Sequence, residues 1–488
     1  MSILQEDSPV QKQAVAIFFK RPEHRIALLC GIFAITLILL KKADALPIQN
    51  TGPIVFLWLG SFVPYLFGCI LILLTRPQQG RWQWIEVGVI LVGAALLRVA
   101  LVATPPNFSG DAWRYLWDAR VTLHDYSPYV YIPDAKPLVP LHDSLVYGQM
   151  GYHDVPTLYP PAAQALYLLS YLLAPSNIVV LKAIFLCFDL TTCGVLALLL
   201  KRRGLDPSRC ILYAWCPLPV VEFAVQGHID VVMLTFVVLM VLCGQSTTYR
   251  ARLLTGLLLG LATLTKLYPL IFLCAVLRRR DYVLLLTCFC TIIAGYIPFI
   301  ILGHGQVFGF FSTYLNQHGG NGGIVLVAIQ LAGEHLKLSQ SSSTLIEHGV
   351  AGVLIIGGVL AVLMLRLRER INVEMAILIL IAIIFSISSF VYPWYVTALI
   401  PWVALLLGPL WTETSKGVAR ISARSIAVLA PWYFICTVDS EYLFLGKFAW
   451  SLYYILVYGG ICALLLLALG VGLSHIVHKN ELKILEGN

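Results

Sequence analysis

The sequence predicts an all-α polytopic membrane protein with about 12–14 transmembrane or re-entrant helices. Hydrophobic residues make up 59% of its 488 residues and charged residues only 12%, far from the balance of soluble globular domains. Apolar runs of about 18 or more residues recur, each long enough to cross a hydrocarbon core of roughly 30 Å. Such runs must be helical, because lipid offers their backbone groups no hydrogen-bond partners.

The expected spans follow from these apolar runs. The clear runs are 25–41, 54–75, 85–104, 178–200, 281–302, 347–365, 373–391, 394–411 and 449–474. Shorter or interrupted runs are 159–174, 210–226, 228–243, 252–277 and 423–438. The first run follows a polar N-terminal stretch and shows no small-residue cleavage site, so we expect a retained anchor and not a signal peptide.

Basic residues gather in short loops at the ends of the spans, namely Lys20-Arg21, Arg278–Arg280, Arg366 to Arg370, Lys416 to Arg424 and His478-Lys479. The positive-inside rule therefore predicts a plasma (inner) membrane protein with both termini cytoplasmic, and loops 105–157 and 303–346 outside. The net charge of +8 reflects this topology and indicates no nucleic-acid partner.

Two further basic groups, at 201–203 and 250–252, do not fit a simple alternation of loops. Either both lie outside and the chain has about 14 spans, or 159–174 and part of 252–277 are re-entrant and it has about 12. The spans divide the chain into an N-terminal segment with three helices (1–104), an acidic outer loop (105–157), a transmembrane core (158–302), a second outer loop (303–346) and C-terminal helices (347–488).

The twelve cysteines contain no CxxC pair, so neither a disulfide framework nor a zinc site is indicated.

The acidic loop 105–157 is the strongest functional signal, with six aspartates and no glutamate between apolar spans. A helix over 111–124 places Asp111, Tyr115 and Asp118 on one face. Its opposite face carries Trp113, Leu116, Trp117 and Leu123. We expect this helix to lie flat at the membrane surface, with its aromatic side toward lipid and its carboxylates toward a cavity.

Two interpretations of these carboxylates compete. Asp111 is the first acid after the span, where a membrane enzyme can hold a catalytic carboxylate; alternatively it only complements the helix dipole, with Ser109 as N-cap. For the other aspartates of the loop, namely Asp118, Asp125, Asp134 and Asp143, solvation is the preferred explanation, because charge in a loop usually serves solvation.

Ionisable residues also occur inside apolar runs. Glu222, His228 and Asp230 follow a Cys-Pro-Leu-Pro stretch, and Lys266 precedes Tyr268-Pro269. Charge in the membrane is costly, which favours a functional role, and a substrate phosphate would satisfy the lysine as a point charge. The alternatives are a His–Asp pair that holds two helices together and a lysine that reaches from a helix end to lipid headgroups.

Aromatic and polar stretches complete the candidate site. Tyr159-Pro160-Pro161 is expected to begin a helix, because proline is tolerated in a first turn. The same stretch is a candidate wall of the site. The aromatic stretch Tyr392-Pro393-Trp394-Tyr395 is also compatible with an ordinary interfacial belt. The second outer loop contains His318 and Asn321 among glycines, a pattern typical of a binding loop or lid.

These pieces together resemble the GT-C superfamily of membrane glycosyltransferases, and most of all the polyprenyl-phosphomannose-dependent mannosyltransferases of bacteria and archaea. The resemblance runs from about residue 105 to 402. It rests on Asp111-x-x-Arg114-Tyr115 with Ser127-Pro128-Tyr129, Tyr159-Pro160-Pro161, Pro217-Leu218 with Glu222, Gly227-His228-x-Asp230, Gly260 to Lys266-x-x-Pro269, and Pro393-Trp394-Tyr395. Ile229 and Cys216 depart from the Asn that the family often has at these positions, and two extra spans precede the acidic loop, where a single span is usual.

The resemblance implies an inverting transfer of a sugar, mannose in that family, from a polyprenyl phosphate to an acceptor hydroxyl outside the cell. Asp111 would be the general base, and Lys266 with Arg114 or His228 would bind the donor phosphate. The implied substrate-binding residues are Tyr115, Asp118, Tyr159, Glu222, Asp230, His318, Asn321, Tyr392, Trp394 and Tyr395. The implied partners are the lipid donor, a glycolipid or glycan acceptor and the bilayer; no cofactor is required, although the loop has enough acids for a divalent metal.

A transporter or flippase, or a glycan ligase, is the alternative function. Transporters commonly show two related halves, and we see no such internal symmetry in this sequence.

Overall fold

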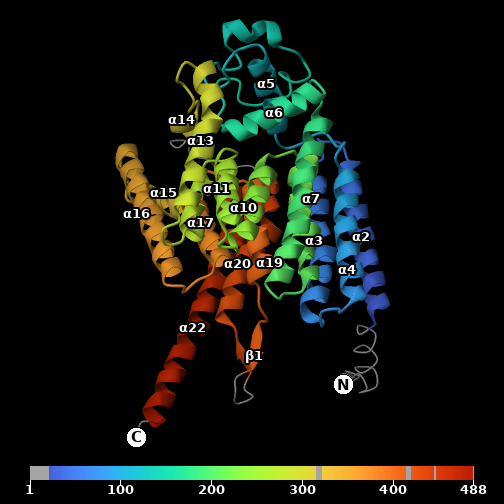
Figure 1. Ribbon diagram of the computed structural model, residues 1–488, viewed down its shortest axis with the longest axis vertical. Coiled ribbons are helices and arrows are strands. Elements are labelled where there is room, and N and C mark those ends of the chain that lie inside the picture. Colours follow the sequence, from blue (N-terminus) through green and yellow to red (C-terminus); the bar gives the residue numbers. More distant parts are fainter. Residues whose placement is uncertain (1–20, 315–320, 414–418, 445–446, 487–488) are drawn as a thin grey trace.

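The protein is helical almost throughout (Figure 1). A computed structural model describes residues 21–314, 321–413, 419–444 and 447–486. Within these ranges the one sheet is a short antiparallel pair, β1 (Trp411–Glu413) and β2 (Ala419–Ile421). In the part of the chain that the structure describes, seven helices are long and apolar enough to cross a membrane, or eight if one bent pair counts as a single span. The predicted fold class, an all-α polytopic membrane protein, is confirmed.

The long helices coincide with the expected apolar runs. They are α2 (Pro22–Asp44), α3 (Thr51–Leu74), α4 (Arg81–Val99), α7 (Ile178–Arg202), α13 (Tyr282–Leu302), α16 (Gln340–Leu367) and α22 (Gly459–Glu486), which continues α21 (Lys447–Tyr453) and η7 (Tyr454–Tyr458). Helices of intermediate length are α5 (Asp111–Leu123), α6 (Pro161–Leu173), α10 (Asp230–Gly244), α11 (Tyr249–Thr263), α15 (Ile324–His335), α17 (Val373–Ile387) and α20 (Ala423–Thr437).

Short helical pieces lie where the apolar runs contain proline. The run 210–226 is built from η2 (Pro207–Cys210), α8 (Ile211–Ala214), α9 (Pro217–Pro219) and η3 (Val220–Val225), with a bend of 52°. The remaining pieces are η1 (Lys136–Leu141), η4 (Tyr268–Phe272), α12 (Leu273–Val276), α14 (Phe311–Tyr314), α18 (Pro393–Val396), η5 (Thr397–Leu399), α19 (Ile400–Leu406) and η6 (Val438–Leu443). Proline has no N–H for the helical ladder and disfavours a helical residue before it, so the ladder breaks where proline occurs. The pieces α14 and η6 contain no proline.

The two basic groups that did not fit the alternation lie with the other basic loops. Arg278 Nη2 donates a hydrogen bond to the carbonyl of Gly244 (2.8 Å), and Arg203 forms an ion pair with Glu374. We call this end of the helical bundle, with loops 201–207, 244–249, 277–281 and 367–373, the basic end. Of the two alternatives, the one in which 201–203 and 250–252 lie outside, opposite the other basic loops, therefore does not fit the structure.

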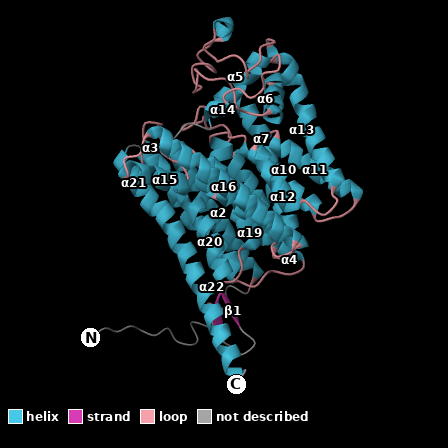
Figure 2. Ribbon diagram, turned by 90° about the vertical axis from the view of Figure 1, so that its left-hand side faces the viewer, coloured by secondary structure: helices cyan, strands magenta, loops and turns pink. Residues whose placement is uncertain are grey.

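Helix α6 explains the altered count. It packs against α5 at the end opposite the basic end (Figures 1 and 2), and the chain then enters α7. The run 252–277 forms α11 and, after a break at Lys266, the shorter η4–α12 that returns to the basic end. These segments match the alternative in which 159–174 does not cross and 252–277 is interrupted.

The acidic segment 105–157 folds around a small hydrophobic core that it shares with α6, α7 and the start of α10. Helix α5 forms as predicted, but Leu116 and Trp117 are buried against Leu138 and Val146 of the same segment. The expectation that this aromatic face lies toward lipid is therefore wrong. The loop after α5 folds back over it and supplies the apolar surface in place of lipid.

A buried ion pair joins α4, α7 and the broken run that follows. Arg98 Nε donates to Asp189 Oδ2 (2.6 Å) and Nη1 donates to the carbonyl of Ala214 (2.7 Å). Tyr213 donates to the other carboxylate oxygen of Asp189 (2.6 Å). Both charged side chains are fully buried, and the extra hydrogen bonds offset the cost of removing the charges from water.

We expect Arg98→Met to lower the thermal midpoint of the detergent-solubilised protein strongly, because Asp189 is left buried without its partner. Removing one partner of a buried pair typically costs ~3–5 kcal/mol. The double variant Arg98→Met, Asp189→Leu is the control and should recover most of the loss. A single variant as stable as wild type, measured by differential scanning fluorimetry, would contradict this role.

Candidate active site

A cavity of about 330 Å³ lies at the end of the bundle opposite the basic end. Its walls come from the start of α5, the loop before α6, the break after α11, the segment before α18 and η6. The polar and aromatic side chains that line it include Asp111, Arg114, Tyr152, Tyr159, Lys266, Tyr392, Trp394, Tyr395, Glu441 and Tyr442. Phe310, just before α14, also lines the cavity, so six parts of the chain that are distant in sequence meet at one site.

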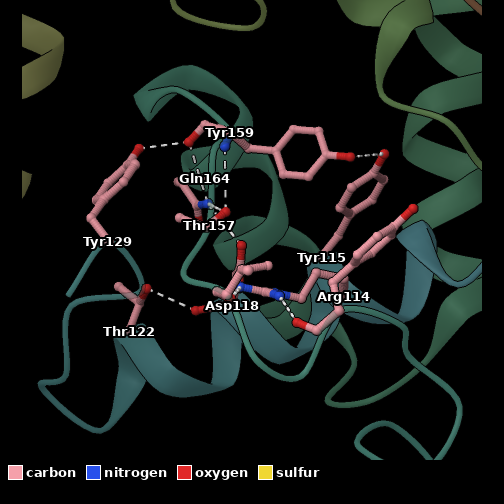
Figure 3. Close-up of polar contacts among 10 residues, drawn as sticks. Arg114, Tyr115, Asp118, Thr122, Tyr129, Thr157, Tyr159 and Gln164 are labelled. Carbon is pink, nitrogen blue, oxygen red and sulfur yellow. Dashed lines mark hydrogen bonds and ion pairs between the residues drawn. The ribbon is translucent and has the colours of Figure 1, made fainter. Parts of the chain in front are cut away.

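Asp111 is the first residue of α5 and is held by a chain of tyrosine hydroxyls. Tyr115 donates to the hydroxyl of Tyr159 (3.4 Å), which donates to Asp111 Oδ2 (3.0 Å). Figure 3 shows the two tyrosines meeting across the site. Burial, followed by the negative charge of Asp111, raises the pKa of both tyrosines well above the usual value. Both hydroxyls therefore stay protonated and remain donors toward the carboxylate.

Arg114 and Asp118 fix the acidic segment beneath this carboxylate. Arg114 Nε donates to Asp118 Oδ1 (2.9 Å), and its two terminal nitrogens donate to the carbonyls of Tyr152 (2.7 Å) and Val155 (3.0 Å). Asp118 Oδ2 accepts from Gln164 Nε2 of α6 (3.0 Å), as Figure 3 shows. Asp118 is thus a buried anchor, and the solvated-loop interpretation of this aspartate is wrong. Arg114 reaches the cavity wall with donors that are already in use within the chain.

Lys266 lies at the break between α11 and η4 and, like Arg114, is a cation of the cavity wall. Its Nζ is 3.3 Å from Asp230 Oδ2. The same nitrogen lies 4.6 Å from the ring centroid of Tyr395 and 5.6 Å from that of Tyr159. Only 9% of the residue is exposed, so it faces the cavity and does not reach lipid headgroups. One carboxylate and two ring faces hold the ammonium group without using all of its donors.

His228 and Glu222 form a buried pair behind the aromatic wall. His228 Nδ1 is 2.9 Å from Glu222 Oε2, and its ring stacks on Trp394 with centroids 3.8 Å apart. Trp394 stacks in turn on Tyr392 (4.4 Å). The partner of His228 is therefore Glu222 and not the Asp230 that the sequence suggested, because Asp230 is turned toward Lys266. His228 and Glu222 lie behind the lining residues and position the aromatic wall.

The sequence analysis missed Glu441 and Tyr442 of η6. Both line the cavity, and Tyr442 also donates toward Glu222 (3.4 Å). The side chain of Asn321 forms a hydrogen bond with Glu441. The signal that could have found them is the acidic pair Asp439 and Glu441 at the end of an apolar run. Charge in a membrane is costly, so this pair indicates a functional role for the same reason as Lys266.

The other expected site residues are placed as follows. Tyr392, Trp394 and Tyr395 line the cavity, as do Tyr159 and Asp111. Tyr115 is fully buried next to it and acts through Tyr159. His318 lies outside the described residues. Among the described residues, no group of three or more His, Cys, Asp or Glu side chains is arranged to hold a metal ion.

Residues 157–393 match the family model of glycosyltransferase family 87. Neither a curated protein nor a solved structure matches the chain. The matched range is just under half of the chain and contains Tyr159, Glu222, His228, Asp230 and Lys266. Together with the helical fold, the match indicates a membrane glycosyltransferase, which implies a glycosyl donor and an acceptor. Asp111 and Glu441 lie outside the matched range and join the cavity only through the fold.

We expect Tyr159→Phe to lower glycosyl transfer, because the tyrosine hydroxyl holds the Asp111 carboxylate by a hydrogen bond that phenylalanine cannot form. The measurement is the turnover rate in detergent. Tyr131→Phe, in the same segment but outside the cavity, is the control. A wild-type rate in Tyr159→Phe would contradict this role of the hydroxyl.

Proposed function

We propose that the protein is an inverting glycosyltransferase that moves a sugar, mannose, from a polyprenyl phosphate to an acceptor hydroxyl. The observation that carries this proposal is that the Asp111 carboxylate and the Lys266 ammonium line the same cavity. A carboxylate base and a phosphate-binding cation are the two groups that displacement of a lipid phosphate by an alcohol requires.

Asp111 is the general base in this scheme. The acceptor hydroxyl attacks the anomeric carbon of the donor, and its proton passes to a carboxylate oxygen of Asp111. The bond between the anomeric carbon and the phosphate oxygen breaks as the new glycosidic bond forms. Because attack comes from the face opposite the phosphate, the anomeric configuration inverts. The hydrogen bond from Tyr159 holds the carboxylate in place for this step.

Lys266 binds the departing phosphate. Its charge is shared with Asp230 and two ring faces, and an incoming phosphate offers it a stronger partner than the rings. Charge grows on the phosphate as the bond breaks, and a fixed cation in a site with little water stabilises that charge. Arg114 and His228 act by positioning the groups around Lys266. The donors of Arg114 are held by Asp118 and two carbonyls, and His228 lies behind the cavity wall.

The aromatic wall is the proposed sugar and lipid contact. Tyr392, Trp394 and Tyr395 present ring faces to the cavity, and such faces offer large apolar area with little conformational freedom to lose. The polyprenyl tail would lie between helices, where burial of apolar area supplies binding energy. The acceptor is a glycolipid or a growing glycan.

The extracytoplasmic side of the plasma membrane is the proposed location of the reaction. The arginines of loops 201–207, 277–281 and 367–373 lie at the basic end. The cavity of Asp111 lies at the opposite end. The excess of Lys and Arg in cytoplasmic loops supports an outward-facing cavity and cytoplasmic termini.

We expect Asp111→Asn to reduce transfer by about 10²–10⁴-fold, the range that general-base catalysis supplies. Binding of the donor should change little, because the amide keeps the shape of the side chain. The assay uses purified protein in nanodiscs with synthetic short-chain polyprenyl-phosphate mannose, and the glucose analogue in parallel. Donor binding is read as thermal stabilisation.

Asp154→Asn is the matched control for this experiment, because Asp154 lies in the same segment and is exposed. It should transfer at the wild-type rate. If Asp111→Asn also transfers at the wild-type rate, the base is another residue, and Glu441 is the next carboxylate on the cavity wall.

We expect the double variant Lys266→Met, Asp230→Asn to weaken donor binding and to slow transfer by about 100-fold, since it removes the cation that stabilises the leaving phosphate. The two changes are made together because Lys266→Met alone leaves Asp230 buried and unpaired. Asp230→Asn alone is the control, and it should keep donor affinity. Normal donor affinity and rate in the double variant would refute the role of Lys266.

A further inference from the structure

A second cavity, of about 280 Å³, lies at the basic end, far from Asp111 along the bundle. It opens where the ends of α7, α10, α12 and α16 meet the start of α17. The side chains with polar groups that line it are Arg202, Arg203, Gln245, Arg278, Arg366 and Asn372. Four of these six carry a permanent positive charge.

Backbone carbonyls hold two of the arginines in place. Arg366 Nε donates to the carbonyl of Ala275 (2.8 Å) and Nη1 to that of Ile371 (2.6 Å). Arg278 Nη2 donates to the carbonyl of Gly244 (2.8 Å). Among the described residues, neither guanidinium has a carboxylate within ion-pair distance. Carbonyls orient a guanidinium without neutralising it, so both arginines bring fixed positive charge to the cavity.

The charge of the cavity wall is only partly balanced. Glu374 forms an ion pair with Arg203, and Asp281 forms one with the nearby Arg252. Burial, and then repulsion by Arg252, lower the pKa of Arg278, although Asp281 acts in the opposite direction. A group of like charges that is partly buried in this way is stabilised by an anion.

Neutral donors at the same place select the kind of anion. Gln245 Nε2 is buried and has no hydrogen-bond partner among the described residues. Val373, the first residue of the 15-residue helix α17, lines the cavity. The first N–H groups of a helix have no partner within the helix and lie at its positive end, and in α17 the side chain of Asn372 accepts that of Met375 (2.9 Å). Planar guanidinium groups together with N–H donors match the geometry of phosphate oxygens.

The surface beside the cavity is apolar. Helix α16, which ends next to Arg366, exposes Leu360 (54%), Met364 (54%) and Leu367 (48%). A lipid whose headgroup enters the cavity could lay its acyl chains along this face. This continuity favours a lipid as the source of the phosphate, although a soluble phosphate compound has the same recognition chemistry.

We propose that the cavity of Arg278, Arg366 and Gln245 binds a phosphate group at the basic end, that of an anionic phospholipid or of a soluble phosphate compound. This site is separate from the cavity of Asp111 and Lys266 and does not depend on the proposed transfer reaction. Basic pockets between helices on the cytoplasmic side of membrane proteins are suited to lipid headgroups.

The test compares lipid retention by the purified full-length protein in native mass spectrometry. Wild type is offered phosphatidylglycerol or phosphatidylcholine. The main variant is Gln245→Glu, which adds a negative charge to the wall and removes no hydrogen bond that the structure shows. Arg278→Gln is the second variant. The control is the double variant Arg279→Gln, Arg280→Gln, which removes two exposed charges of the same loop that do not line the cavity.

We expect wild type and the control to retain phosphatidylglycerol in preference to phosphatidylcholine. Gln245→Glu and Arg278→Gln should each weaken that retention by about fivefold, the contribution of one basic residue near an anionic lipid surface. A thermal midpoint close to wild type in phosphatidylcholine shows that each variant is folded.

A second arm identifies the source of the phosphate. Inorganic phosphate or pyrophosphate is added to protein in phosphatidylcholine nanodiscs, and the thermal midpoint is measured. Phosphate or pyrophosphate could stabilise wild type but not Gln245→Glu, while wild type shows no selective retention of phosphatidylglycerol. That result supports the site and assigns it to a soluble phosphate compound. The proposal is overturned if neither ligand discriminates wild type from Gln245→Glu, or if the control loses retention as much as the cavity variants do.

Discussion

The cost of placing charge inside an apolar bundle governs the arrangement of this protein. Buried ionised groups are expensive in lipid and in protein alike, and they persist only with partners or with access to water. Arg98 and Asp189 meet this requirement with each other and with Tyr213. Lys266 and Asp230 also pair, but their site opens into a cavity. The first pair fixes the packing of helices, and the second is available to a ligand.

The breaks in the helices bring the groups that line the cavity together. Pro269 prevents α11 from continuing as a regular helix, so the chain turns at Lys266. The same interruption frees the carbonyl of Leu264, which accepts the N–H of Ala162 at the start of α6 (2.8 Å). Helix α6 in turn holds Asp118 through Gln164. A break in a membrane helix thus positions the acidic segment that carries Asp111.

The sequence predicts much of the fold, because apolar runs and prolines determine helices and breaks locally. The run around Lys266 and the helix that begins at Asp111 are examples. The environment of that helix could not be predicted, since Trp117 packs against residues that fold back from later in the segment. Contacts between distant segments also determine three features of the site, and local residue patterns do not predict such contacts. These features are the pairing of His228 with Glu222, the anchoring of Arg114 and the position of Glu441 of η6 at the cavity.

In the proposed reaction, a sugar leaves a polyprenyl phosphate with inversion in the cavity between Asp111 and Lys266. The decisive experiment incubates the wild-type protein in nanodiscs with a polyprenyl-phosphate sugar of known anomeric configuration and determines the configuration of the transferred sugar by nuclear magnetic resonance. We expect release of polyprenyl phosphate together with a product of the opposite configuration. A product that retains the configuration of the donor, or no release of polyprenyl phosphate from either the mannose or the glucose donor, would contradict it.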